Sequence, residues 1–123
     1  MQHKKYLITG LVALSFLLAC GENAQTSSAT ESPEAKTEAL FTARCGMCHG
    51  FKEDKIGPAL AGVQQRWGGD KEKLKAFIRN SQTVIGSGDP YAVALYEKWN
   101  KSAMPSFNDI SEADMNALVD YLK

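Results

Sequence analysis

Apolar side chains recur at helical spacing in the second half of the sequence, and no useful stretch alternates apolar and polar residues as a strand would. The clearest stretch closes the chain, at positions spaced i, i+3, i+4 and i+7, and consists of Met115, Leu118, Val119 and Leu122. Side chains at this spacing share one face of a helix. Because Ser111 and Asp114 form a capping-box pattern, we predict that the last helix begins at Ser111.

Three more helices are predicted from residues that favour helix starts. Serine, threonine and aspartate accept hydrogen bonds from the first free amides of a helix, and proline fits its first turn. The first helix is expected from about Pro33 or Thr37 to Cys48, the second after Asp70 and the third from Asp89-Pro90. The expected fold class is all-α, with about four helices and long loops. Loops this long are unusual in a helical bundle that binds nothing, so we infer that they surround a bound group.

The N-terminus is typical of an export signal. A basic start, which includes Lys4 and Lys5, precedes an apolar run at residues 6–18. This run is shorter than the ~20 residues that a membrane-spanning helix needs. It ends in Leu-Leu-Ala before Cys20, which resembles the lipobox of bacterial lipoproteins. We therefore predict a lipoprotein signal peptide at residues 1–19 and a lipid on Cys20; the alternative is an ordinary signal peptide with an incidental Cys20.

The next segment cannot form a core, because residues 21–36 contain no large apolar side chain. We predict that residues 20–36 are the lipid-bearing cysteine and a flexible tether, and that residues 37–123 are the folded domain. A domain of this size often needs a covalent cross-link or a cofactor to be stable. The 14 basic and 14 acidic residues balance, so nothing indicates a nucleic-acid partner, and we expect a monomer.

The sequence Cys45-Gly46-Met47-Cys48-His49 is a C-x-x-C-H motif, the signature of covalent attachment of c-type haem. Thiols at this spacing, Cys45 and Cys48, can each bond one vinyl group of the same macrocycle. The imidazole of His49 then lies beside the iron and becomes its proximal ligand. Haem c is attached outside the bacterial cytoplasm, so the motif agrees with the export signal. We expect one covalently bound haem c.

Other uses of this motif fit less well. A structural zinc site needs four ligands, and the exported chain offers Cys45, Cys48 and His49 without a second Cys/His pair. A redox-active dithiol favours a βαβ context, for which the sequence gives no sign. A disulfide between the two cysteines would leave His49 unexplained.

The second axial ligand is predicted by elimination. His49 is the only histidine left once the signal peptide is removed, so methionine is the natural alternative. Met1 leaves with the signal, Met47 lies between the two anchoring thiols, and Met115 lies on the apolar face of the last helix. Met104 stands in a loop before a proline, which restrains the backbone that presents its sulfur. Met104 is therefore the predicted distal ligand; a gap-filling hydrophobe is the alternative.

The chain resembles the class I bacterial cytochromes c over nearly all of residues 37–123. The resemblance rests on ordered features, which are Phe41, the CGMCH motif, Ile56-Gly57-Pro58-Ala59-Leu60, the MPSF segment at 104–107 and the closing helix. It implies the class I fold, in which the last helix crosses the first and would pair Phe41 with Leu118 and Tyr121. It also implies that the carbonyl of Pro58 accepts a hydrogen bond from His49 and orients the imidazole.

Two features of the chain are not settled by the resemblance. The family often has glycine eight residues before the first haem cysteine, where the two helices cross, and Thr37 stands there in this chain. The crossing would then be wider or shifted. Trp67 could donate its indole N–H to a haem propionate, but core packing is an equal alternative for Trp67 and for Trp99.

Histidine and methionine ligation leaves no open position on the iron, so the expected function is outer-sphere electron transfer and not enzymatic catalysis. The expected protein is a carrier in a respiratory chain, held by lipid on the periplasmic side of a bacterial membrane, between a quinol-oxidising complex and a terminal oxidase. One alternative is a fixed haem subunit of a larger respiratory complex. Another is an enzyme or sensor with an open haem site, which requires Met104 to be absent from the iron.

Charged residues give a weak indication about partners. Lysines and an arginine between Lys71 and Arg79 lie on one predicted helix, and acidic residues between Asp109 and Asp120 lie on or near another. A basic patch on the first of these helices could steer a redox partner, although charged faces of helices are usually just solvated.

Overall fold

The computed structural model describes residues 32–123. These residues form six helices, which are α1 (Pro33–Arg44), α2 (Val63–Arg66), α3 (Lys71–Arg79), α4 (Ser81–Gly86), α5 (Pro90–Lys98) and α6 (Glu112–Tyr121). Residues 32–123 contain no strand, in agreement with the all-α prediction. The predicted signal peptide, Cys20 and the tether up to residue 31 lie outside the described residues. Residues 33–36, which the sequence assigned to the tether, are helical and belong to α1.

The four predicted helices begin where their capping residues indicate. Side-chain oxygens of the capping residues accept hydrogen bonds from amides in the first helical turn, and these residues are Ser32, Asp70, Asp89 and Ser111. The Ser111 hydroxyl accepts from the amide of Asp114, as a capping box predicts, and it also donates to a carboxylate oxygen of Asp114 at 2.8 Å. Helix α1 ends at Arg44 and not at Cys48, because the chain turns into the motif there.

Two short helices are additions to the predicted set. Helix α2 has 4 residues and follows Gly62, whose positive φ of 71° suits glycine. Helix α4 has 6 residues and follows Asn80, whose side chain accepts a hydrogen bond from the amide of Thr83. Elements this short span fewer than two turns, so they carry too few apolar positions for a periodic pattern.

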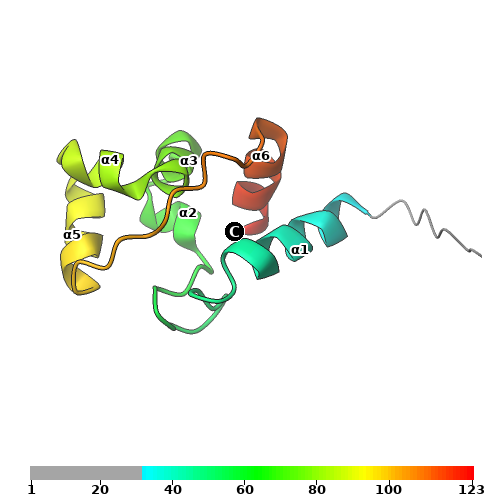
Figure 1. The fold of residues 1–123 in the computed structure, drawn as a ribbon, viewed down its shortest axis with the longest axis horizontal. Helices are drawn as coiled ribbons and strands as arrows, with labels where there is room; N and C mark the ends of the chain where they lie inside the picture. Colours follow the sequence, from blue (N-terminus) through cyan, green and yellow to red (C-terminus); the bar gives the residue numbers. More distant parts are fainter. Residues whose placement is uncertain (1–31) are drawn as a thin grey trace, which may run out of the picture.

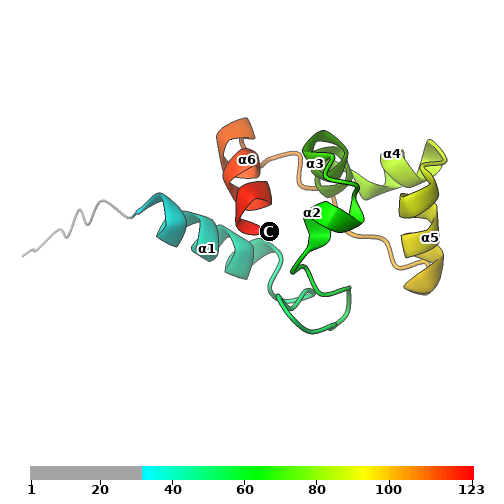
Figure 2. The same cartoon turned by 180° about the vertical axis from the view of Figure 1, so that it is seen from behind.

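Helices α1 and α6 pack against each other, and Figures 1 and 2 show them side by side in both views. The rings of Phe41 and Tyr121 lie 5.6 Å apart at this contact, and Leu118 is fully buried in the same core. Thr37, one helical turn before Phe41 on α1, is also buried, and its hydroxyl donates to the carbonyl of Pro33 at 2.8 Å. A threonine can therefore replace the expected glycine in this core without leaving its hydroxyl unpaired.

Opposite charges join α3 to α6. The ammonium nitrogen of Lys71 lies 2.5 Å from a carboxylate oxygen of Asp120. The carboxylate of Glu112 forms ion pairs with Lys75 and Arg79, with N–O distances of 3.0 Å and 2.6 Å. Lys75 is the most enclosed of these side chains, at 11% exposure. Three bases of α3 are thus paired with acids of α6, and the fourth, Lys73, lies 3.5 Å from Asp89, which argues against the free basic patch considered from the sequence.

The Glu112 contacts predict a pH-dependent contribution to stability. Hydrogen bonds from Lys75 and Arg79 lower the pKa of Glu112 below its usual value of 4.5. A lowered folded-state pKa stabilises the protein above the unfolded pKa, and this stabilisation is lost as pH falls through the folded value. We expect Glu112→Gln to unfold at lower urea concentration than wild type near pH 7, and the difference to shrink as the pH falls below the usual glutamate pKa value of 4.5. Glu38→Gln, on the exposed face of α1, is the control; equal urea midpoints for both variants near pH 7 would contradict the assignment.

The segment between α5 and α6 crosses the molecule, as the orange trace in Figure 1 shows. Its first turn reverses the chain after α5, because Asn100 and Lys101 have positive φ angles of 53° and 58°. Their amides donate to the carbonyls of Glu97 and Tyr96, which ends the helix. The chain then runs toward α6 past α3 and α4 (Figure 1). Met104 lies on this segment and lines an internal pocket.

No helix within residues 32–123 combines the length and the apolar character needed to cross a membrane.

Candidate functional site

The C-x-x-C-H motif forms a tight turn at the end of α1. The amide of Cys45 donates to the carbonyl of Phe41 at 2.8 Å, and the amides of Cys48 and His49 donate to the carbonyl of Cys45 at 3.0 and 2.9 Å. These bonds hold both thiols and the imidazole on one continuous stretch of ordered backbone. Neither Cys45 nor Cys48 forms a disulfide within the described residues.

Burial raises the pKa of the Cys45 thiol to about 11, although the charge of Arg44 acts in the opposite direction. The nucleophilic cysteine of a redox dithiol needs a lowered pKa, since the thiolate is the reactive form. The burial of Cys45 therefore disfavours the redox-dithiol alternative. No three side chains of His, Cys, Asp or Glu gather into a metal site anywhere in residues 32–123, which disfavours structural zinc.

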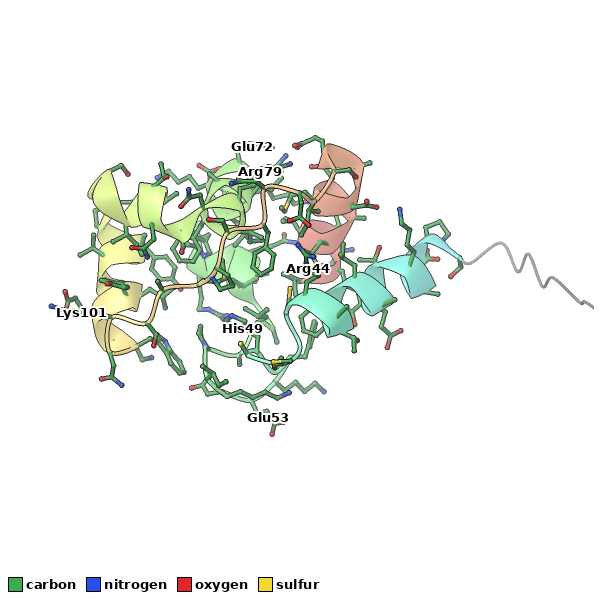
Figure 3. The ribbon with its side chains drawn as sticks, viewed as in Figure 1. Arg44, His49, Glu53, Glu72, Arg79 and Lys101 are labelled. Atoms are coloured by element: carbon green, nitrogen blue, oxygen red, sulfur yellow. The ribbon has the colours of Figure 1, made fainter. Side chains whose placement is uncertain are left out.

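The imidazole of His49 is held from two sides. Its Nδ1 lies 2.8 Å from the carbonyl oxygen of Pro58, the contact that the family resemblance implied. With the proton on Nδ1, the ring donates to Pro58 and leaves Nε2 free to bind a metal. Gly57 packs against the same ring so closely that a Cβ there would lie 2.5 Å from His49 Cε1. Figure 3 shows His49 on the loop after α1, pointing toward the middle of the molecule.

His49 faces a pocket with mostly apolar walls. Cys45 and Cys48 line one end of this pocket, and Met104 lines it as well. Much of the remaining wall is aliphatic or aromatic and includes Leu60, Val63, Trp67, Leu74, Phe77, Ile78, Ile85, Leu95, Phe107 and Leu118. An apolar pocket with a few polar or sulfur groups in it is the usual form of a cofactor site.

Met104 stands apart from the other two methionines of the described region. It is half-buried and lines the pocket, whereas Met47 is 82% exposed and Met115 is fully buried in the core at 0%. The burial of Met115 agrees with the core role predicted from its position on α6. Met104 is therefore the methionine in residues 32–123 that is placed to share a ligand with His49.

Trp99, which lines the pocket, carries a hydrogen-bond donor without a partner. The Nε1 atom of Trp99 is closed off from solvent and makes no hydrogen bond. Leaving such a group unpaired costs about 1–3 kcal/mol, so an acceptor on a bound group would be favoured there. Trp67 instead packs its ring against Phe77 and Tyr91, with both centroid distances at 4.9 Å. The sequence had offered Trp67 as the donor to a propionate, and no sequence pattern distinguished Trp99.

These residues fit a haem in chemistry and in arrangement. Two thiols could bond its vinyl groups, an imidazole and a thioether could bind its iron, and a buried N–H could donate to its carboxylate. Apolar walls suit the macrocycle. The site thus combines, from separate parts of the chain, every kind of group that covalent haem requires.

Comparisons with known proteins agree with this arrangement. The sequence pattern of the cytochrome c family matches residues 34–123. Among solved structures, the cytochrome c domain of a Pseudomonas putida protein superposes with a TM-score of 0.60 at 31% sequence identity. The alignment covers 70% of this chain and 83% of that domain. The chain therefore belongs to the cytochrome c family, the class I proteins that transfer electrons with a covalently bound haem c.

Proposed function

We propose that this protein is a lipid-tethered carrier that passes single electrons through one haem with histidine and methionine ligands. Cys45 and Cys48 would hold the haem through thioether bonds, and His49 and Met104 would be the axial ligands of its iron. The observation that carries the proposal is the shared pocket, which both thiols, the imidazole and the thioether all line.

The residues of the pocket account for the expected chemistry. When bound, haem supplies an iron that takes up and releases one electron. The carbonyl of Pro58 accepts a hydrogen bond from Nδ1–H of His49, which keeps the ring oriented and would make Nε2 a stronger metal ligand. The thioether of Met104 would favour the reduced state of a bound haem iron, and the apolar walls would act in the same direction because they disfavour extra charge. With both axial positions taken by protein side chains, no site would remain for a substrate.

The membrane tether and the partners are a second part of the proposal. The lipobox-like sequence before Cys20 supports export and a lipid anchor on the periplasmic side of a bacterial membrane. A tethered carrier would exchange electrons with neighbours in the same membrane, and we propose a quinol-oxidising complex as donor and a terminal oxidase as acceptor. Contacts of this kind are brief and use small interfaces.

Experiments can distinguish the proposed carrier from the two alternative functions. A fixed haem subunit would migrate with a large complex when detergent-solubilised native membranes are separated by gel filtration, whereas a free carrier would migrate alone. An open-site haem enzyme or sensor would have five-coordinate, high-spin ferric iron in the wild-type protein. The half-buried position of Met104 in the pocket wall favours the carrier over the open site.

The mass of the mature protein tests the covalent attachments. Protein purified from a host that attaches haem c should carry the mass of one haem and of the lipid, and should keep its colour through acid–acetone extraction. Cys20→Ser should lose the lipid but keep the haem, while Cys48→Ser should lose one thioether bond and keep the lipid. A colourless wild-type protein, or pigment that is removed by extraction, would exclude the haem assignment.

A further inference from the structure

Ser81 is the most buried hydroxyl in the wall of the pocket. Its side chain is 1% exposed, and its Oγ donates to the carbonyl of Met104 at 3.0 Å. The start of helix α4 does not need this hydroxyl, since the side chain of Asn80 already accepts the hydrogen bond from the amide of Thr83. The hydrogen bond of the Ser81 hydroxyl therefore serves the segment that carries Met104 and not the start of α4.

Two further contacts join the same segment to the end of α3. The amide of Phe107 donates to the carbonyl of Arg79 at 3.0 Å, and Arg79 Nη1 donates to the carbonyl of Ile110 at 3.0 Å. Figure 3 shows Arg79 beside this segment where it approaches α6. These contacts act downstream of Met104, so Ser81 is the one that holds the backbone of Met104 itself.

The peptide of Met104 has little freedom once the Ser81 hydrogen bond is made. Pro105 follows Met104 and disfavours the helical region for the backbone angles of Met104. The hydrogen bond from Ser81 then fixes the direction of the Met104 carbonyl, and with it the direction in which the side chain leaves the backbone. A carbonyl that lost this partner would gain alternative orientations, and the sulfur would move with it.

We propose that Ser81 is a positioning residue that holds the thioether of Met104 on the haem iron. This inference rests on the proposed ligation by His49 and Met104, and it adds a group that the sequence did not indicate. Ser81 touches neither iron nor haem in this role; it acts through the backbone of Met104. Its effect should therefore appear in how readily another ligand displaces the thioether.

Titration of the ferric, haem-loaded protein with imidazole tests this role. Imidazole competes with Met104 for the iron, and its binding removes the weak absorption band that a thioether gives with ferric iron at the red end of the spectrum. We expect Ser81→Ala to bind imidazole about fivefold more tightly than wild type, as the loss of one hydrogen bond of ordinary strength predicts. The unliganded variant should show a weaker thioether band.

Ser87→Ala is the matched control, because Ser87 Oγ also donates to a carbonyl, that of Val84 at 2.8 Å, within the same helical region but away from Met104. It should leave the imidazole affinity and the thioether band unchanged. Equal affinities for the two alanine variants, in a wild-type protein that has the band, would overturn the positioning role alone. A wild-type protein without the band would instead overturn methionine ligation and, with it, the proposed function.

A second pair of variants distinguishes the effect of the Ser81 hydrogen bond from the effect of packing at this buried position. Ser81→Thr and Ser81→Val have nearly the same shape, but only threonine keeps a hydroxyl. The threonine variant should bind imidazole more weakly than the valine variant. Equal imidazole affinities for the threonine and valine variants would show that the packing of residue 81, and not its hydroxyl, sets the affinity, and the inference would be wrong.

Discussion

Met104→Leu is expected to abolish the thioether band of the ferric protein and to lower its reduction potential by on the order of 0.1 V. Leucine fills a similar volume but has no sulfur, so the pocket wall stays packed while the iron loses a ligand that favours Fe(II). The ferric iron should become high-spin or bind water. Absorption spectroscopy and a potentiometric titration of the haem-loaded protein measure both effects.

Met115→Leu is the matched control for this experiment. Met115 is fully buried in the core contributed by α6, and a volume-conserving exchange there should cost less than about 1.5 kcal/mol of stability and leave the spectrum unchanged. A Met104→Leu protein with the wild-type spectrum and potential would exclude Met104 as the ligand. High-spin ferric iron in the wild type would instead favour the open-site alternative.

Gly57→Ala is expected to disturb His49 although residue 57 binds nothing itself. The added Cβ would lie 2.5 Å from Cε1 and 2.9 Å from Nδ1 of the imidazole, well inside normal contact. The backbone of Gly57 cannot retreat freely, because its amide donates to the carbonyl of Cys48 at 2.8 Å. Either the ring or the loop must move, so we expect a loss of about 1–3 kcal/mol in unfolding free energy.

The same variant should change the spectroscopy of the proximal ligand. Movement of the His49 ring would lengthen or break the hydrogen bond from Nδ1 to the carbonyl of Pro58. In the reduced haem-loaded protein, the chemical shift of the Nδ1 proton reports this bond directly. Gly86→Ala is the control, since a Cβ at the end of α4 meets no atom within 4 Å. Equal unfolding midpoints for the two variants would contradict the close packing of Gly57 on the imidazole.

The sequence alone determined the helix class, most helix starts and the chemistry of the motif. Capping residues such as Asp70 and Ser111 act on amides within the next few residues, so their effect can be read locally. The C-x-x-C-H motif is equally local, because both thiols and His49 lie on one turn. Met104 could be predicted only by eliminating the other methionines and by the family resemblance.

The tertiary structure decided which further residues meet around the pocket. Ser81 reaches the carbonyl of Met104, Gly57 packs on the ring of His49, and Trp99 keeps a buried N–H without a partner. Nothing near Ser81 or Trp99 in the sequence marks either residue. Gly57 belongs to the Gly-Pro segment noted in the sequence, but that segment does not reveal its contact with the ring of His49. Their roles depend on how α4, the loop after α1 and the segment after α5 meet around one pocket, which is a property of packing between segments far apart in the chain.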